Sequence, residues 1–318
     1  MISALFPAAG AASLVLKATL LLAATALAAG LLARRGAPAA VRHLVWSLAI
    51  AALLALPLLA AVLPGWRVPV AALPAPAAMP ALPVLDDAVP LPPAAVAEEA
   101  PPVAGVSAGA AVPVRPPALA WREILVLAYL LGVAFLAGRL ALGWWRVRRL
   151  ARTAERVEDG RWVALVRELQ DRLGVPGEVR LLRGGFASMP MTWGTFRPVV
   201  LLPSDADEWP EEMRRVVLLH ELAHVARRDC LTQTLAGVAC ALYWFHPGAW
   251  YAARRLRVER ELACDDRVLA AGTRAPTYAR HLLDIAAAFR LVPAGAAHAV
   301  SMARPSQLEG RLLAVLDG

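Results

Sequence analysis

The chain has 318 residues, of which 59 % are hydrophobic and only 18 % charged, and its mean hydropathy is +0.54. This composition excludes a wholly soluble protein and places part of the chain in lipid. The net charge of +8 comes almost entirely from arginine, and no arginine cluster alternates with aromatic residues, so we expect no direct nucleic-acid contact. The three cysteines, Cys230, Cys240 and Cys264, do not form a disulfide framework or a zinc-ligand pattern, which fits a reducing compartment.

Two apolar segments near the N-terminus are each long enough to span a bilayer. They cover about residues 12–32 and 44–63. No positive charge precedes the first segment, whereas Arg34 and Arg35 follow it, which argues against a signal peptide. The positive-inside rule then places the short connecting loop in the cytoplasm and the N-terminus outside. Lys17 is costly within the first span, so we expect it to face other helices or to reach toward an interface.

The segment from residue 64 to residue 117 contains more than half of the 26 prolines. Such a composition cannot form a helix or a central strand, and it predicts an extended, largely disordered linker outside the cytoplasmic membrane. A third predicted span covers about residues 120–143. Tryptophans mark both of its ends, and five arginines follow it closely, namely Arg146, Arg148, Arg149, Arg152 and Arg156. The chain after this span is therefore predicted to lie on the cytoplasmic side.

The remaining sequence mixes helical and strand patterns. Helical periodicity covers residues 162–173, and two strand-like pieces follow at 178–182 and 198–202. The apolar stretch 231–251 has the length of a fourth span, but a span there would separate the candidate site residues on either side of it. If those residues share one metal, this stretch must be a buried, re-entrant or membrane-grazing helix. Helices broken near Gly272 and between residues 292 and 305 complete the chain.

A run of the form H-E-x-x-H, from His220 to His224, lies in a strongly helical stretch. Residues four apart emerge from one face of a helix, so the two imidazoles can bind one zinc ion, and Glu221 can direct its carboxylate at a metal-bound water. Two satisfied core histidines are the competing interpretation. The flanking residues are apolar, however, and burying an unliganded His-Glu-His cluster among them would be costly.

A catalytic zinc ion needs a third protein ligand, and the acidic segment 259–266 offers one. Glu261 is the preferred candidate, and Asp265 shares its helical face and can hydrogen-bond a ligating histidine. Glu259 is the rival ligand, but it lies about 200° around the helix from Glu261. A solvated charged face beside the neighbouring arginines remains the alternative for both glutamates.

These motifs together resemble the BlaR/MecR-type integral-membrane zinc metallopeptidases, a gluzincin-like family that includes β-lactam sensor-transducers of resistant bacteria. The likeness rests on HELAHVARRD at 220–229, EREL-ACDD at 259–266, the leading spans, the pattern Pro190, Thr192, Gly194, Pro198, and Phe245-His246-Pro247. It implies a mainly α membrane protein in which region 1–150 carries the transmembrane helices. Residues 151–318 would form an α+β zincin-like metallopeptidase domain with a small β-sheet or hairpin, facing the cytoplasm.

The resemblance also implies roles for individual residues. His220, His224 and Glu261 would bind one zinc ion, and Glu221 would be the general base. The segment 192–203 would supply a substrate-aligning edge strand, with Thr192, Trp193 and Gly194 binding the substrate. His246 would have a transition-state or structural role.

The sequence departs from the family pattern in two respects. Sensor-type members carry a penicillin-binding domain with a Ser-x-x-Lys nucleophile, but Leu14 stands three positions before Lys17, the single lysine of this chain, so no β-lactam acylation is expected. The sequence also ends at Gly318, where sensor-type relatives continue into a fourth span. A short family member, a truncated product and a fragment all fit that end.

The functional prediction is a membrane-embedded zinc endopeptidase of the bacterial inner membrane. Its expected substrate is a cytoplasmic transcriptional regulator, such as a repressor, or the chain itself. A non-proteolytic signal transducer with a structural zinc domain is the first alternative, although such a site would not need Glu221. The heat-shock and prenyl-protein type of four-span metallopeptidase is the second, but that family usually places its third ligand farther from the histidines.

Overall fold

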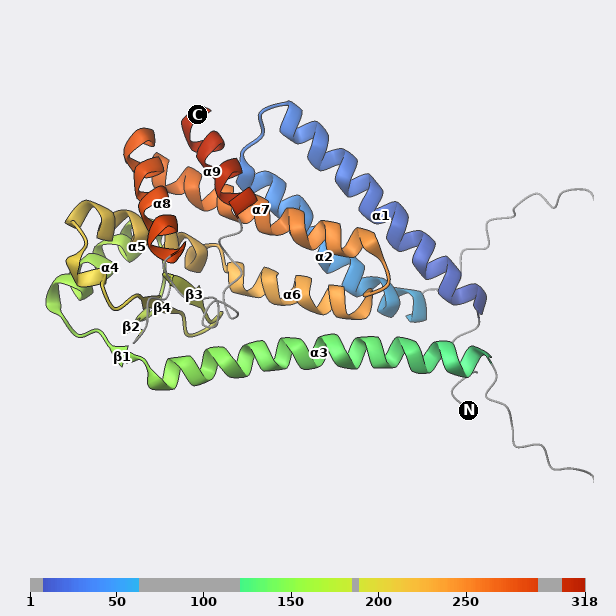
Figure 1. Cartoon of the computed structure of the whole chain (residues 1–318). Helices are drawn as coiled ribbons and strands as arrows, with labels where there is room; N and C mark the ends of the chain where they lie inside the picture. Colours follow the sequence, from blue (N-terminus) through green and yellow to red (C-terminus); the bar gives the residue numbers. More distant parts are fainter. Residues whose placement is uncertain (1–7, 63–120, 185–188, 291–304, 318) are drawn as a thin grey trace, which may run out of the picture.

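The computed structural model describes residues 8–62, 121–184, 189–290 and 305–317, so the predicted proline-rich linker lies outside the described residues. Figure 1 shows long helices running side by side toward a smaller mixed part that holds a sheet. The helices are α1 (Ala8–Arg34), α2 (Ala39–Val62), α3 (Trp121–Thr153), α4 (Gly160–Leu173), α5 (Glu211–Ala226), α6 (Asp229–Leu242), α7 (Pro247–Ala270), α8 (Ala275–Arg290) and α9 (Pro305–Asp317). The strands are β1 (Glu155–Arg156), β2 (Arg180–Arg183), β3 (Met191–Trp193) and β4 (Val199–Leu202), and a short 3-10 turn, η2, covers Ala206–Glu208.

Three of these helices, α1, α2 and α3, are long and apolar enough to cross a membrane, which confirms the predicted fold class. Helix α3 differs from its predicted span because it continues through the arginines to Thr153, and arginine is a good helix former. Lys17 is exposed, whereas its neighbour Ala18 is fully buried, so the expectation that Lys17 faces other described helices is wrong. About 25 Å of helix separates Lys17 from Arg34, which is close to the roughly 30 Å thickness of a bilayer core. The other expectation, that the Lys17 side chain reaches an interface, therefore stays open.

The stretch 231–251 is not a fourth span. Helix α6 ends at Leu242, the chain turns through residues 243–246, and α7 returns beside α6 (Figure 1). The break has a local cause, because Pro247 is the first residue of α7 and lacks the N–H that a continuing helix would need. The resulting α6–α7 hairpin packs against α1, α2 and α3.

Side-chain hydrogen bonds fix the turn of this hairpin to each of the three membrane helices. Three of them join Thr19 Oγ1 and His246 Nε2 at 3.0 Å, Tyr243 Oη and Leu53 O at 3.0 Å, and Tyr129 Oη and Leu242 O at 3.1 Å. A non-helical turn among apolar helices must satisfy its polar groups within the protein, because lipid offers no partners. The three bonds explain how this turn can lie there.

Helix α7 connects the membrane helices to the smaller part of the molecule. Its N-terminal half presents Ala249, Ala252 and Ala253 in the cluster that contains Trp46 and Ile50 of α2. Small residues let two helix backbones approach closely, which is how helices associate in lipid. Farther along, Val268 of α7 belongs to a second core formed by α4, the sheet, α5, α8 and α9. One helix therefore fixes the position of the two parts relative to each other.

The sheet has the order β1-β2-β4-β3, with β2 and β4 parallel and both outer pairs antiparallel. The predicted strands at 178–182 and 198–202 correspond to β2 and β4. Only β3 is an edge strand in this region, because β4 is buried and paired on both sides. Within the segment 192–203, which we expected to supply an edge strand, the edge is formed by β3 and not by β4. A turn at Gly194, whose φ is +90°, reverses the chain so that β3 and β4 pair antiparallel.

The contact between α3 and the α6–α7 hairpin generates a prediction. A Cβ atom at Gly132 would overlap the indole of Trp244, whereas a Cβ atom at Gly138, on the same helix, would meet no atom within 4 Å. Gly132→Leu should therefore lower stability by about 1–3 kcal/mol through overpacking. Thermal unfolding in detergent would measure this loss against the control Gly138→Leu. Equal midpoints for the two variants would contradict this packing.

Candidate metal centre

Helix α5 carries the two histidines on one face. Pro210 precedes the helix, and Glu211 and Glu212 occupy its first turn, where negative charge is favourable. The His220 and His224 rings lie 4.9 Å apart between centroids, one turn from each other. The side chains between and around them, including Leu222, are buried in the core. The H-E-x-x-H pattern is therefore anchored by packing on one side and open on the other.

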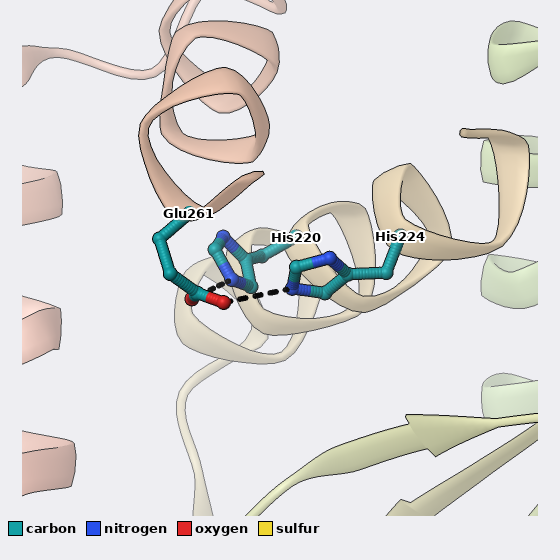
Figure 2. A group of neighbouring side chains, drawn as sticks. All are labelled: His220, His224 and Glu261. Carbon is teal, nitrogen blue, oxygen red and sulfur yellow. Dashed lines mark ion pairs between the residues drawn. The ribbon is translucent and has the colours of Figure 1, made fainter. Parts of the chain in front are cut away.

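Helix α7 brings Glu261 to this histidine pair, as Figure 2 shows. Glu261 Oε2 lies 3.7 Å from His220 Nε2, and Glu261 Oε1 lies 4.0 Å from His224 Nε2. One ligand atom from each of the three residues falls within 4.8 Å of the others. All three side chains are only 11–12 % exposed. Two imidazole nitrogens and a carboxylate at this separation form a donor set that suits a catalytic zinc ion.

Glu259, the rival ligand, is held elsewhere. Its side chain is 1 % exposed, and its carboxylate accepts hydrogen bonds from Arg42 at 2.8 Å and from Arg255. Arg42 belongs to α2, so this carboxylate ties α7 to a membrane helix. The structure thus brings Glu261, and not Glu259, to the histidines.

The Nδ1 atom of His220 meets a buried polar cluster. Asp265 Oδ1 lies 3.3 Å from this nitrogen, and the Tyr278 hydroxyl lies 3.1 Å from it and donates to Asp265 at 2.6 Å. Arg311 of α9 donates to both Asp265 oxygens, at 2.8 and 2.6 Å. Asp265 occupies the position that the sequence predicted. Tyr278 and Arg311 carry no motif, and nothing in their helices distinguishes them from other buried or charged residues.

The Nδ1 atom of His224 has a different partner, Asp229, whose Oδ2 lies 2.8 Å away. The chain reaches this position by reversing at Arg228, which has φ +54° and is the only non-glycine residue with positive φ in the described chain. Asp229 lies only five residues after His224, so its position in the sequence could have suggested it as a hydrogen-bond partner of a ligating histidine. The sequence predicted only Asp265 for that role. The Cys264 Sγ atom lies 3.2 Å from the same nitrogen and fills the space beside Asp229.

The charges around the histidines favour a cation between them. Burial alone would lower the pKa of His220, but its hydrogen bonds to Asp265 and Glu261 raise it to about 9. Burial would also raise the carboxyl pKa values, but Arg311 lowers the pKa of Asp265 to about 2, and Arg260 and the histidines hold that of Glu261 well below its ordinary value. The carboxylates thus stay ionised and attract positive charge. A divalent metal ion would compete with a proton for the imidazoles.

Glu221 faces the edge strand. The Thr192 hydroxyl of β3 donates to Glu221 Oε2 at 2.6 Å. A cavity of about 260 Å³ adjoins this pair, and it is lined by Thr192, Gly194, Glu221 and both histidines, together with residues of α8 and α9. Side chains alternate along a strand, and Trp193 packs under the sheet instead, near Val199 and Leu201. The predicted substrate contact of Trp193 therefore lacks structural support.

His246 lies at the start of α7. Its Nδ1 accepts a hydrogen bond from the Gly248 N–H at 3.1 Å, which caps the helix, and its Nε2 pairs with Thr19. The helix between residues 246 and 261 is about 22 Å long at 1.5 Å per residue. This distance excludes direct contact with a reaction at Glu261, so of the two predicted roles the structure supports the structural one.

Comparisons with known proteins agree with this geometry. The chain matches the BlaR1 peptidase M56 family over residues 12–315. It is also 28 % identical over 141 residues to the regulatory protein BlaR1 of Bacillus licheniformis, a match that covers 44 % of this chain and 24 % of that protein. The family match includes the membrane helices, both ligand-bearing helices and the sheet. The chain therefore belongs to the BlaR1 peptidase M56 family, as its resemblance to the BlaR/MecR type predicted.

Proposed function

We propose that this protein is a membrane-embedded zinc metalloendopeptidase. The convergence of His220, His224 and Glu261 beside Glu221 carries the proposal. These three residues would hold one zinc ion and leave a coordination position open. When bound there, zinc would lower the pKa of water and polarise the scissile carbonyl. Glu221 would take the proton of that water and deliver it to the leaving amine, while Thr192 orients the carboxylate.

The substrate would bind as an extended peptide along β3. Among the described residues, one edge of this strand is unpaired beside the cavity, so its N–H and C=O groups can pair with a substrate backbone. Backbone pairing gives little sequence preference by itself. The cavity residues Gly194, Leu282 and Leu308 would then contact substrate side chains.

We place the metal centre on the cytoplasmic side of the bacterial inner membrane. The arginine-rich end of α3 and the basic α1–α2 connection both lie at the end of the membrane helices nearer the sheet (Figure 1). Two independent basic segments at one end support a single orientation by the positive-inside rule. A cytoplasmic transcriptional regulator, or the chain itself, is the substrate that this orientation favours.

One observation favours the alternative of a non-proteolytic transducer with a structural metal. Arg260 donates to Glu261 Oε1 at 2.6 and 3.0 Å, so part of this carboxylate is engaged within the protein. Glu261 Oε2, however, still faces His220. The two functions differ in whether they need Glu221, because a structural metal site requires no general base.

The first prediction concerns the general base. Glu221→Gln should leave zinc bound and abolish peptide cleavage, because an amide cannot accept the water proton. Zinc content by mass spectrometry and cleavage of an unstructured protein by the detergent-purified chain would test this. Glu212→Gln, at an exposed position of the same helix, should change neither quantity. Cleavage at the wild-type rate by the Glu221 variant, with zinc bound, would eliminate the proposed mechanism.

The second prediction concerns the third ligand. Glu261→Ala should weaken zinc binding by more than the roughly 10–100-fold that loss of an outer hydrogen-bond partner costs. Asp266→Asn, an exposed position on the same helix, is the matched control. Competition with a chromophoric chelator would measure both affinities. An unchanged affinity in the Glu261 variant would remove this residue from the ligand set.

The third prediction concerns Thr192. Removing its hydroxyl in Thr192→Val takes away the 2.6 Å hydrogen bond to Glu221, so kcat should fall about 10-fold with little change in KM. Thr192→Ser, which keeps the hydroxyl, should restore kcat. If Thr192→Val matches the wild type in both kcat and KM, the hydroxyl has no role in orienting Glu221.

A further inference from the structure

The start of α2 contacts α6 and α7 beside the candidate metal centre. Arg42 binds Glu259 of α7 at 2.8 Å, and the next residue, His43, points toward Asp229 at the start of α6. Its side chain is 7 % exposed and that of Asp229 is 3 % exposed. A partly buried arginine and a buried histidine from a membrane helix therefore lie beside the candidate metal centre, and the proposed chemistry uses neither.

Asp229 has two oxygens with different surroundings. Its Oδ2 lies 2.8 Å from His224 Nδ1, accepts a hydrogen bond from the Cys264 thiol at 3.6 Å, and forms an ion pair with Arg227 at 3.4 Å. Its Oδ1 is buried and has no hydrogen-bond partner among the described residues. His43 Nε2, likewise buried and without such a partner, lies 3.8 Å from this oxygen.

The cost of burial makes this pairing informative. A buried polar atom without a partner loses its hydration without compensation, and native proteins contain few such atoms. Here two of them, one acidic and one basic, face each other across a gap slightly longer than a hydrogen bond. A shift of less than about 1 Å in either side chain would bring them within hydrogen-bond distance.

We propose that His43 is a positioning residue of the metal centre and acts through Asp229. By holding Oδ1, His43 would fix the carboxylate so that Oδ2 keeps the His224 ring in the tautomer and orientation that direct Nε2 to the metal. The membrane helix α2 is then part of the metal centre and not only an anchor. This inference rests on the proposed zinc site at His220, His224 and Glu261.

The experiment measures zinc affinity of the full chain in lipid nanodiscs by competition with a chromophoric chelator. His43→Phe keeps an aromatic ring but removes both nitrogens, and we expect it to bind zinc about 10-fold more weakly, at the lower end of outer-partner effects. His43→Gln, which places an amide nitrogen near the Nε2 position, should retain the affinity. His43→Asn, whose amide ends near Nδ1, should not. Leu44→Phe, on the exposed face of α2, controls for an added aromatic ring.

Two further measurements separate positioning from general destabilisation. The thermal midpoint of the zinc-free protein should be the same for His43→Gln and His43→Asn, although their affinities differ. In an Asp229→Asn background, His43→Phe should cause no additional loss, because the carboxylate that transmits its effect is absent. The d–d absorption spectrum of the cobalt-substituted protein should change in His43→Phe and not in Leu44→Phe.

Distinct outcomes would overturn this inference and the proposed function. Equal zinc affinities of the Gln and Asn variants, or a full additional loss in the Asp229→Asn background, would show that His43 does not position the metal centre. Wild-type protein that binds zinc without cleaving any peptide would contradict the endopeptidase and leave the role of His43 standing. Wild-type protein that binds no zinc would overturn both.

Discussion

The candidate metal centre depends on the crossing of two helices, α5 and α7, at the point where Glu261 meets His220 and His224. The H-E-x-x-H motif lies on α5 alone, and the rest of the fold must bring α7 to it. The α6–α7 hairpin performs this delivery, because it enters the group of membrane helices and returns α7 past α5 (Figure 1). The polar groups of its turn find partners on α1, α2 and α3, which an apolar environment requires.

The burial of charge explains why so many elements meet at this centre. Glu261, Asp265 and Asp229 are all largely buried and remain ionised, so each needs a positive or hydrogen-bonding partner. Those partners come from Arg260 on α7, from Arg311 on α9 and from His224 on α5. Moving any one of these helices would leave a buried charge without its partner. Electrostatics thus fixes the geometry that apolar packing alone would leave loose.

Membrane helices and chemistry are not separate parts of this molecule. Helix α7 packs its small residues on α2 at one end and joins the core beneath the sheet at the other, with Glu261 between these two contacts. Residues 42 and 43 of α2 lie next to the acidic groups of the metal centre. A division of the chain at residue 150 is a useful description of the sequence, but α2 packs extensively against α7 across that boundary.

The sequence by itself determined the features that depend on neighbours along one helix. These include the histidine pair with Glu221 at helical spacing, the three apolar helices, and Asp265 one turn after Glu261. Hydropathy and residue spacing record such features directly, because a helix places residues four apart on one face. The sequence also predicted Glu261 as the third candidate metal ligand, because of its helical face and the family resemblance.

Only the tertiary structure decided the rest. The stretch 231–251 has the composition of a span, yet its partners on α1, α2 and α3 make it a helix, a turn and a second helix. Tyr278, Arg311 and His43 reach the centre from distant segments, and Trp193 turns away from it although it adjoins Thr192. The reason is that a contact between remote residues depends on how whole helices pack and which buried charges they must satisfy. Local periodicity carries no record of that.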